Sequence, residues 1–199
     1  MATTDINSMG KLNADQGICG FTSSLYALYT HSPRKTELSE GAEVETRMLA
    51  EIKTYLKLLQ ADNRVDLLSA IQSFTRSFGG AYTNFDLDKY IERINATVSV
   101  NGGALGDFSI AMPPEAVVDY LRRACDFKSA KLLTGNMPDP AELILGLCST
   151  QMREYKGLAH YVYQLNGTVY SWGKQFGSVQ QAAAAAHESW SVGHKIAIT

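Results

Sequence analysis

The residues best suited to do chemistry lie in "DQGICGFTSSLYALY", residues 15–29, where Cys19 stands between Gly17 and Gly20 and begins an apolar run. Apolar residues at helical spacing predict a helix from Cys19 to about His31. A thiolate at a helix N-terminus is stabilised by the helix dipole and by unpaired backbone N–H groups, which can also bind an oxyanion. Cys19 is therefore a candidate nucleophile, with the two glycines leaving room for a substrate. A free cysteine here is also commonly a packing residue.

A second candidate is His160, in the segment "AHYVYQLNGTVYSWG". Asn166-Gly167 predicts a two-residue hairpin, because both central residues of a type I′ turn need positive φ. The resulting register sets these residues opposite one another: Leu165 and Thr168, Tyr163 and Tyr170, Val162 and Ser171, His160 and Gly173. Since strand side chains alternate, one face carries His160, Val162, Gln164, Val169 and Ser171. The other face, which we expect to pack on the protein, carries Tyr161, Tyr163, Tyr170 and Trp172.

A cysteine at a helix start and a histidine on a facing strand can together attack an amide carbonyl. The histidine accepts the thiol proton and later returns it to the leaving group. An imidazolium next to the sulfur would lower the thiol pKa below its reference value of about 8.5. The pair of Cys19 and His160 therefore predicts a thiolate that alkylating reagents attack rapidly down to pH 5 or 6, as estimated roughly from these reference values.

Both segments resemble the papain-like cysteine peptidase superfamily. "DQGICGFTSSL" is similar to its nucleophile segment, most of all in the C39-like peptidases, and "GLAHYVYQLNGTVYSWG" is similar to the segment in which the base histidine begins a strand. The order along the chain also matches, with the cysteine early, then helices, then the histidine on a late strand. The resemblance covers about thirty residues in its two motifs. It implies a papain-like fold and, by analogy with bacterial effectors and toxins of this fold, a protease, deamidase or amidase.

The resemblance implies two further site residues, and here the chain departs from the family pattern. The family orients its histidine with a later Asn or Asp, but none follows Gly167. Ser171 shares the predicted face of His160, Gln175 is the alternative orienter, and Trp172 lies on the opposite face unless a bulge shifts the register. The family's oxyanion-hole glutamine stands about six residues before the cysteine, where this chain has Asn13. We expect Gln16, three residues before Cys19, to fill that role, with Asn13 behind it.

Other residues are weaker candidates. Aligning "QGxCG" of papain directly would put Thr22 at the nucleophile, inside the predicted helix. Cys125 and Cys148 follow apolar stretches and indicate core positions. His194 begins the last predicted strand and is the main rival for the base. His31 and His187 are typical of helix surfaces. Three widely spaced cysteines argue against a disulfide framework and against a zinc site, and indicate a reducing compartment.

Composition narrows the class of protein. The 199 residues carry a formal net charge of −2, with 18 basic and 20 acidic residues and no basic stripe, so nucleic acid is not an expected partner. No apolar run reaches membrane-spanning length, and the N-terminus lacks a secretory signal pattern. We expect residues 1–14 to be a flexible arm and residues 15–199 to be one domain. A protein made in a bacterial cytoplasm, and exported by a specialised secretion system, fits these features.

The expected elements run from helices to strands. Helices are expected at about 42–60, from Asn63 as N-cap to Gly79-Gly80, over "DLDKYIERI", and from Pro113-Pro114 to about Phe127. Residues 96–112 could be a hairpin or a loop. Strands are expected in "AKLLTG", "ELILGLCS", "AHYVYQL", "TVYSWG" and "HKIAIT", with a helix over "VQQAAAAAHESW". This order predicts an α+β fold with an N-terminal helical layer packed on a C-terminal antiparallel sheet.

The sequence thus predicts a cysteine-dependent amide hydrolase acting through a thioacyl intermediate. Cys19 would be the nucleophile, His160 the base, Ser171 its orienter, and Gln16 with the Cys19 amide the oxyanion donors. No cofactor or metal is expected. The expected partners are a protein or peptide substrate, with no membrane, and a secretion-apparatus or immunity protein. The alternative is a papain-like scaffold without activity that binds proteins.

Overall fold

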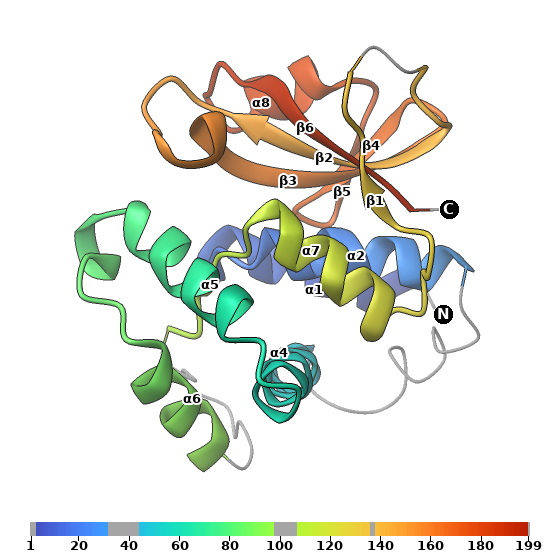
Figure 1. The fold of residues 1–199 in the computed structure, drawn as a ribbon. Helices are drawn as coiled ribbons and strands as arrows, with labels where there is room; N and C mark the ends of the chain where they lie inside the picture. The colour runs from blue at the N-terminus through green and yellow to red at the C-terminus, as the bar shows by residue number, and fades with distance from the viewer. Residues whose placement is uncertain (1–2, 32–43, 98–106, 136–137, 199) are drawn as a thin grey trace.

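The structure, a computed structural model, describes residues 3–31, 44–97, 107–135 and 138–198. It has the expected α+β organisation, with helices mostly in the first part of the chain and strands in the last part (Figure 1). The α-helices among these residues are α1 (Thr3–Gln16), α2 (Cys19–His31), α4 (Val44–Ala61), α5 (Val65–Ser77), α6 (Leu87–Ala96), α7 (Pro114–Arg123) and α8 (Val179–Ala185). The strands are β1 (Lys131–Leu132), β2 (Glu142–Cys148), β3 (Leu158–Leu165), β4 (Thr168–Ser171), β5 (Lys174–Phe176) and β6 (Ser191–Ala197).

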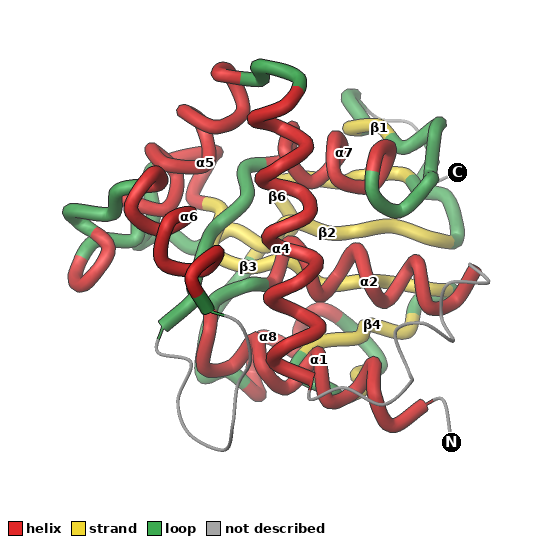
Figure 2. Tube along the Cα trace, turned by 90° about the horizontal axis from the view of Figure 1, so that it is seen from below, coloured by secondary structure: helices red, strands yellow, loops and turns green. Residues whose placement is uncertain are grey.

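The elements form layers around one antiparallel sheet of order β1-β6-β2-β3-β4-β5. Helices α1, α2 and α7 cover one face, and α4, α5 and α6 lie beyond them. In Figure 2, which looks from the helical side, α4 crosses in front of α2. The short α8 covers the opposite face. Alternation along β2 explains both cores, because Ile144 faces the helical layers while Leu143, Leu145 and Leu147 face α8. None of the helices in the described part of the chain is long and apolar enough to cross a membrane.

The β3–β4 hairpin follows the predicted turn but is shorter than expected. Asn166 and Gly167 have φ of 49° and 83°, and Leu165 pairs with Thr168 and Tyr163 with Tyr170, as predicted. Pairing with β4 ends there, so the expected pairing of His160 with Gly173 is wrong. After Ser171 the chain instead turns into β5, a strand that the sequence analysis missed. The first half of β3 therefore has β2 on one side only, and its other edge faces the candidate site.

The expected flexible arm over residues 1–14 is wrong, because residues 3–16 form helix α1. Its Ile6 and Met9 are buried in the main core, with Met9 fully covered, and Asn13 is 6% exposed. Ile6, Met9 and Asn13 stand three or four residues apart, which is the spacing of one helix face. The polar composition of the segment hid this short apolar stripe, and only its docking on the rest of the chain stabilises the helix.

The remaining helices largely follow the expected ranges, with different ends. Asn63 does not cap α5; it has a positive φ of 52°, and Arg64 is the N-cap. Pro114 is the first residue of α7, which ends at Arg123 rather than Phe127. Residues 107–113 have neither helix nor strand, whereas 98–106, the rest of the expected hairpin or loop, lie outside the described residues.

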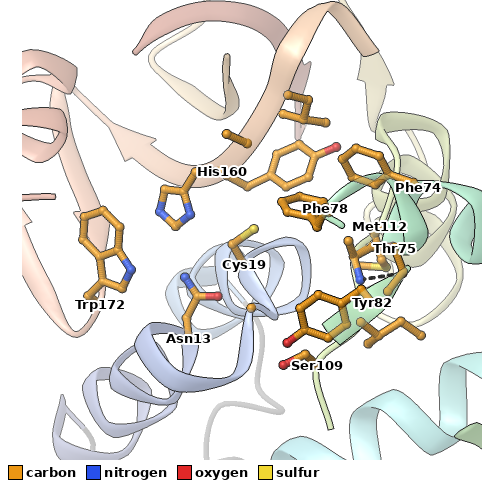
Figure 3. A pocket seen from close by; sticks show the side chains of 16 residues that line it. Asn13, Cys19, Phe74, Thr75, Phe78, Tyr82, Ser109, Met112, His160 and Trp172 are labelled. Carbon is orange, nitrogen blue, oxygen red and sulfur yellow. Dashed lines mark hydrogen bonds between the residues drawn. The ribbon is translucent and has the colours of Figure 1, made fainter. Parts of the chain in front are cut away.

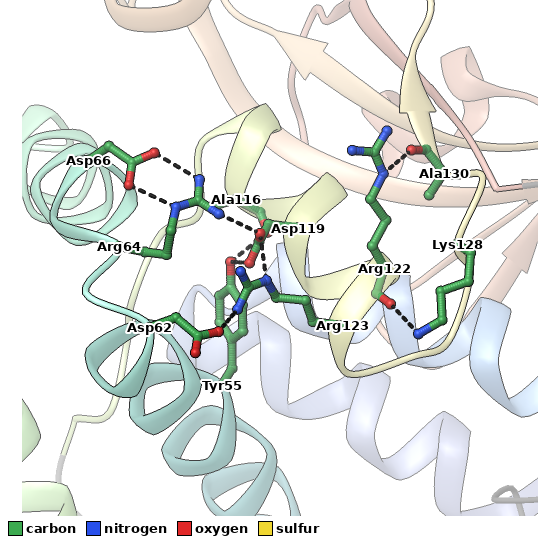
Figure 4. A network of polar contacts seen from close by, with 10 residues as sticks. All are labelled: Tyr55, Asp62, Arg64, Asp66, Ala116, Asp119, Arg122, Arg123, Lys128 and Ala130. Carbon is green, nitrogen blue, oxygen red and sulfur yellow. Dashed lines mark hydrogen bonds and ion pairs between the residues drawn. The ribbon is translucent and has the colours of Figure 1, made fainter.

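A polar network joins α4, α5 and α7 (Figure 4). The Asp119 carboxylate accepts hydrogen bonds from Arg64 and from the Tyr55 hydroxyl, at 3.0 and 3.1 Å, and pairs with Arg123 at 3.0 Å. Arg123 also contacts Asp62 at the end of α4. The Asp119 side chain is only 13% exposed, so these partners compensate for the loss of water around its carboxylate.

Candidate active site

The candidate site is a pocket of about 120 Å³ between the helical layers and the edge of the sheet. Cys19 and His160 both line it, so the structure brings the predicted nucleophile and base to one place, and Figure 3 shows them close together with Asn13 and Trp172. Much of the remaining lining is apolar and includes Phe74, Phe78, Ile110, Ala111, Met112 and Leu158. No Lys, Arg, Asp or Glu side chain lines the pocket, as far as the structure describes the chain.

Local backbone geometry places Cys19 at the first position of α2. Helix α1 ends at Gln16, and Gly17 follows with φ of 57°, a left-handed conformation that favours glycine. The carbonyl of Ile18 accepts the first helical hydrogen bonds, from the N–H groups of Phe21 and Thr22. Because only Gly17 and Ile18 separate the two helices, the sequence fixes the sulfur close to the end of α1.

Gly20 has a different role from the one expected. A Cβ on Gly20 would lie 3.0 Å from the Met112 side chain and 3.3 Å from Val117. Gly20 therefore allows close packing between α2, α7 and the segment before α7, rather than leaving room for a substrate. Thr22 is buried, its hydroxyl donates to the Cys19 carbonyl at 3.3 Å, and it does not line the pocket.

His160 is held by a hydroxyl and two indole rings. Its Nε2 lies 2.8 Å from the Ser171 hydroxyl, so Ser171, the preferred orienter, is in contact with the ring. The ring stacks on Trp172 at a centroid distance of 4.5 Å and an angle of 6°, and on Trp190 at 5.2 Å and 28°. His160 itself is only 6% exposed. With Nε2 bonded to Ser171, Nδ1 is the nitrogen free to accept the thiol proton.

The expected position of Trp172 is wrong. Its φ of 49° ends the alternation of β4 and turns the indole toward His160, instead of toward the face shared by Tyr161, Tyr163 and Tyr170. Trp190 was missed altogether. It precedes β6 and reaches the histidine only because β6 and β3 flank the same strand, β2. A tryptophan next to a strand carries no sequence signal for this contact.

The expected oxyanion donor Gln16 points elsewhere. Its side-chain oxygen accepts a hydrogen bond from the backbone N–H of Phe108 at 3.0 Å, and Gln16 does not line the pocket. It instead fixes the segment 107–112, which the Thr75 hydroxyl also holds by accepting from the Ala111 N–H at 3.1 Å. Asn13 lines the pocket, one turn earlier in α1, and its buried side-chain oxygen has no hydrogen-bond partner among the described residues. Among the described residues that line the pocket, Asn13 therefore supplies the side-chain amide.

The pKa shifts of Cys19 and His160 run in the opposite directions from those that the expected ion pair would produce. Burial raises the pKa of Cys19 to about 11, although backbone N–H groups of Tyr161, Gly20 and Cys19 offset part of this effect. Burial also lowers the pKa of His160 to about 3. Without substrate, the site therefore holds a neutral thiol and a neutral imidazole at neutral pH. The helix N-terminus alone does not outweigh the loss of water around the sulfur.

The other candidates lie away from the pocket. Gln175 is exposed on β5, where it pairs with Tyr170 rather than reaching His160. His194 contacts the Tyr155 carbonyl at 2.6 Å and does not line the pocket. Cys125 and Cys148 are buried, as expected. In the described part of the chain, no cluster of three or more His, Cys, Asp or Glu side chains could hold a metal ion.

Comparisons with protein-family models, with curated proteins and with solved structures find no match to this chain.

Proposed function

We propose that this protein is a cysteine-dependent amide hydrolase of papain-like arrangement. The observation that carries the proposal is the placement of His160 in the same pocket as Cys19, with Nε2 bonded to Ser171 and Nδ1 left for the thiol. A nucleophile at a helix start, a base across from it and a third group that holds the base are the parts that nucleophilic catalysis at a carbonyl requires.

In this proposal His160 Nδ1 accepts the Cys19 proton as the sulfur attacks the amide carbonyl. The proton on Nε2 is donated to the Ser171 hydroxyl oxygen, which fixes the tautomer. The Cys19 backbone N–H and the Asn13 side-chain amide stabilise the oxyanion, with Asn13 replacing the Gln16 of our expectation. His160 then donates its proton to the leaving amine, and water hydrolyses the thioacyl bond with His160 again as base.

The neutral resting pair favours proton transfer during attack rather than a preformed thiolate. The sulfur must lose its proton inside a site that disfavours charge, so substrate must align with the pair before the transfer is productive. Such a site reacts slowly with small alkylating reagents and faster with reagents that occupy the pocket. The substrate we propose is a protein or peptide with an uncharged group at the reacting carbonyl, because no Lys, Arg, Asp or Glu side chain lines the described pocket.

The test is active-site labelling followed by substrate profiling. A peptidyl acyloxymethyl ketone series with neutral, acidic and basic side chains is incubated with the protein, and the labelled residue is identified by mass spectrometry. We expect label on Cys19, faster with neutral members, and loss of label in Cys19→Ala and His160→Asn. Cys125 is the internal control, because its side chain is buried away from the pocket. Equal labelling of Cys19 and Cys125 in the folded protein would refute the proposal.

The second candidate is a papain-like scaffold that binds proteins without catalysis. The raised pKa of Cys19 and the lowered pKa of His160 favour it, because both shifts disfavour the charged forms that catalysis passes through. The two candidates differ in the dependence of labelling on His160. A binding scaffold would give a Cys19 labelling rate that His160→Asn leaves unchanged. Bacterial origin, export and a secretion-apparatus or immunity partner remain predictions from the sequence resemblance.

A further inference from the structure

The β4–β5 turn that carries the histidine contacts is packed directly against helix α1. The turn consists of Trp172 and Gly173, with φ of 49° and 71°, between the paired residues Ser171 and Lys174. Gly173 lies on the backbone carbonyl of Asn7, and a Cβ there would also come within 2.8 Å of the Lys11 side chain. The turn therefore touches α1 through backbone, where no side chain can adjust.

Gly10 forms the other half of this contact. A Cβ on Gly10 would lie 2.6 Å from the Gly173 nitrogen and 3.1 Å from its Cα, and it would also collide with the Tyr26 hydroxyl. Gly10 is inside α1 and has no unusual backbone conformation, so its conformational freedom is not used. The structure requires glycine at this position because only a residue without a side chain lets α1 approach the turn so closely.

The β4–β5 turn also determines the position of the His160 ring. Ser171, immediately before the turn, is hydrogen-bonded to His160 Nε2 at 2.8 Å. Trp172, the first residue of the turn, is stacked on the imidazole at 4.5 Å. A shift of the Gly173 backbone would move both contacts together. Helix α1 also carries Asn13, three residues after Gly10, so the same helix contacts the turn and lines the pocket.

We infer that Gly10 is a positioning residue for His160, acting through the backbone contact between α1 and Gly173. Helix α1 is then an integral part of the candidate active site. The consequence for catalysis rests on the proposed function. The effect on the packing of His160 with Trp172 and Trp190, here called the histidine cluster, does not. Trp172 and Trp190 are the two tryptophans of the chain, and both stack on His160, so intrinsic tryptophan fluorescence reports on this cluster alone.

The experiment compares Gly10→Ala with Ala14→Gly in the full chain. Alanine is the better helix former, so Gly10→Ala strengthens α1 intrinsically, while Ala14→Gly weakens it at an exposed position. We expect Gly10→Ala to shift the tryptophan emission to longer wavelength and to increase acrylamide quenching. Ala14→Gly should leave both unchanged at temperatures where it is folded. Unchanged emission in Gly10→Ala, or equal changes in the two variants, would overturn the inference.

Two further measurements separate the possible causes. The double variant Gly10→Ala/Tyr26→Phe, compared with Tyr26→Phe, removes the collision with the hydroxyl and keeps the one with Gly173, so it should still show the red shift. Full recovery of the emission would assign the effect to Tyr26 and overturn the inference. The rate at which a neutral peptidyl acyloxymethyl ketone labels Cys19 should fall roughly tenfold to a hundredfold in Gly10→Ala, since misplacement of about 1 Å has such effects on a reaction that needs the aligned pair. Should Cys19 prove unreactive in the parent protein, the proposed function fails, and the emission still decides the role of Gly10.

Discussion

Replacing His160 by asparagine should remove a defined part of the protein's sensitivity to acid. Burial lowers the pKa of His160 from 6.5 to about 3 in the folded protein, while the unfolded chain keeps the ordinary value. Between these two values the unfolded state binds one more proton than the folded state. Stability therefore falls as pH falls from 6.5 toward 3, and below that both states are protonated and the loss stops.

The size of the effect follows from the two pKa values. Between pH 7 and about pH 4.5, protonation of the unfolded histidine should cost the folded protein about 2.5 kcal/mol, an order-of-magnitude figure from proton linkage. Asparagine has no titratable group, so His160→Asn should lack this loss. It should be less stable at pH 7 through the lost ring packing and the lost bond to Ser171, an offset that does not vary with pH.

The assay is urea unfolding of both proteins at several pH values between 4.5 and 7. The measured quantity is the difference in unfolding free energy between them, which cancels the acid sensitivity of the carboxylates that they share. We expect the difference to shrink by about 2.5 kcal/mol as the pH falls over this range. A difference that stays constant would mean that the folded protein leaves the pKa of His160 at its ordinary value and would refute the reasoning. A difference that grows as the pH falls would return the site to the thiolate–imidazolium pair, which raises the pKa of the histidine.

Three further predictions concern the thiol, its neighbours and the scaffold. The rate of Cys19 alkylation by iodoacetamide should keep rising with pH beyond pH 9, because burial raises the thiol pKa to about 11; a plateau below pH 8 would contradict this. Ser171→Ala should lower the turnover or labelling rate about tenfold, since a neutral hydroxyl contributes roughly one hydrogen bond, whereas Gln175→Ala, at an exposed position, should have no effect. Asp119→Ala should cost about 2 kcal/mol in urea unfolding, because two guanidinium groups lose their shared partner. Its control is Asp66→Ala at a largely exposed carboxylate, which should leave the urea unfolding curve close to that of the parent protein. If Asp66→Ala lost more stability than Asp119→Ala, the stabilising partner of Arg64 would be Asp66, and the assignment to Asp119 would be wrong.

Local signals in the sequence were sufficient for much of the fold. The α+β order, the range of α2 from Cys19 to His31 and the turn at Asn166-Gly167 each depend on residues close together in the chain. Helical spacing, glycine conformation and strand alternation act over a few residues, so they can be recognised without knowing what packs where. The hairpin register predicted in the same way that Ser171 shares the strand face of His160, and the two side chains are in contact.

What the sequence by itself determined is thus which residues could react: a cysteine at a helix start and a histidine beside a hairpin turn. The tertiary structure decided their surroundings. It turned Trp172 toward His160, brought Trp190 from the other side of the sheet, directed Gln16 to a loop and left Asn13 in the pocket. It also decided the protonation states, because burial depends on which distant segments cover a group, and no pattern of neighbours along the chain encodes that.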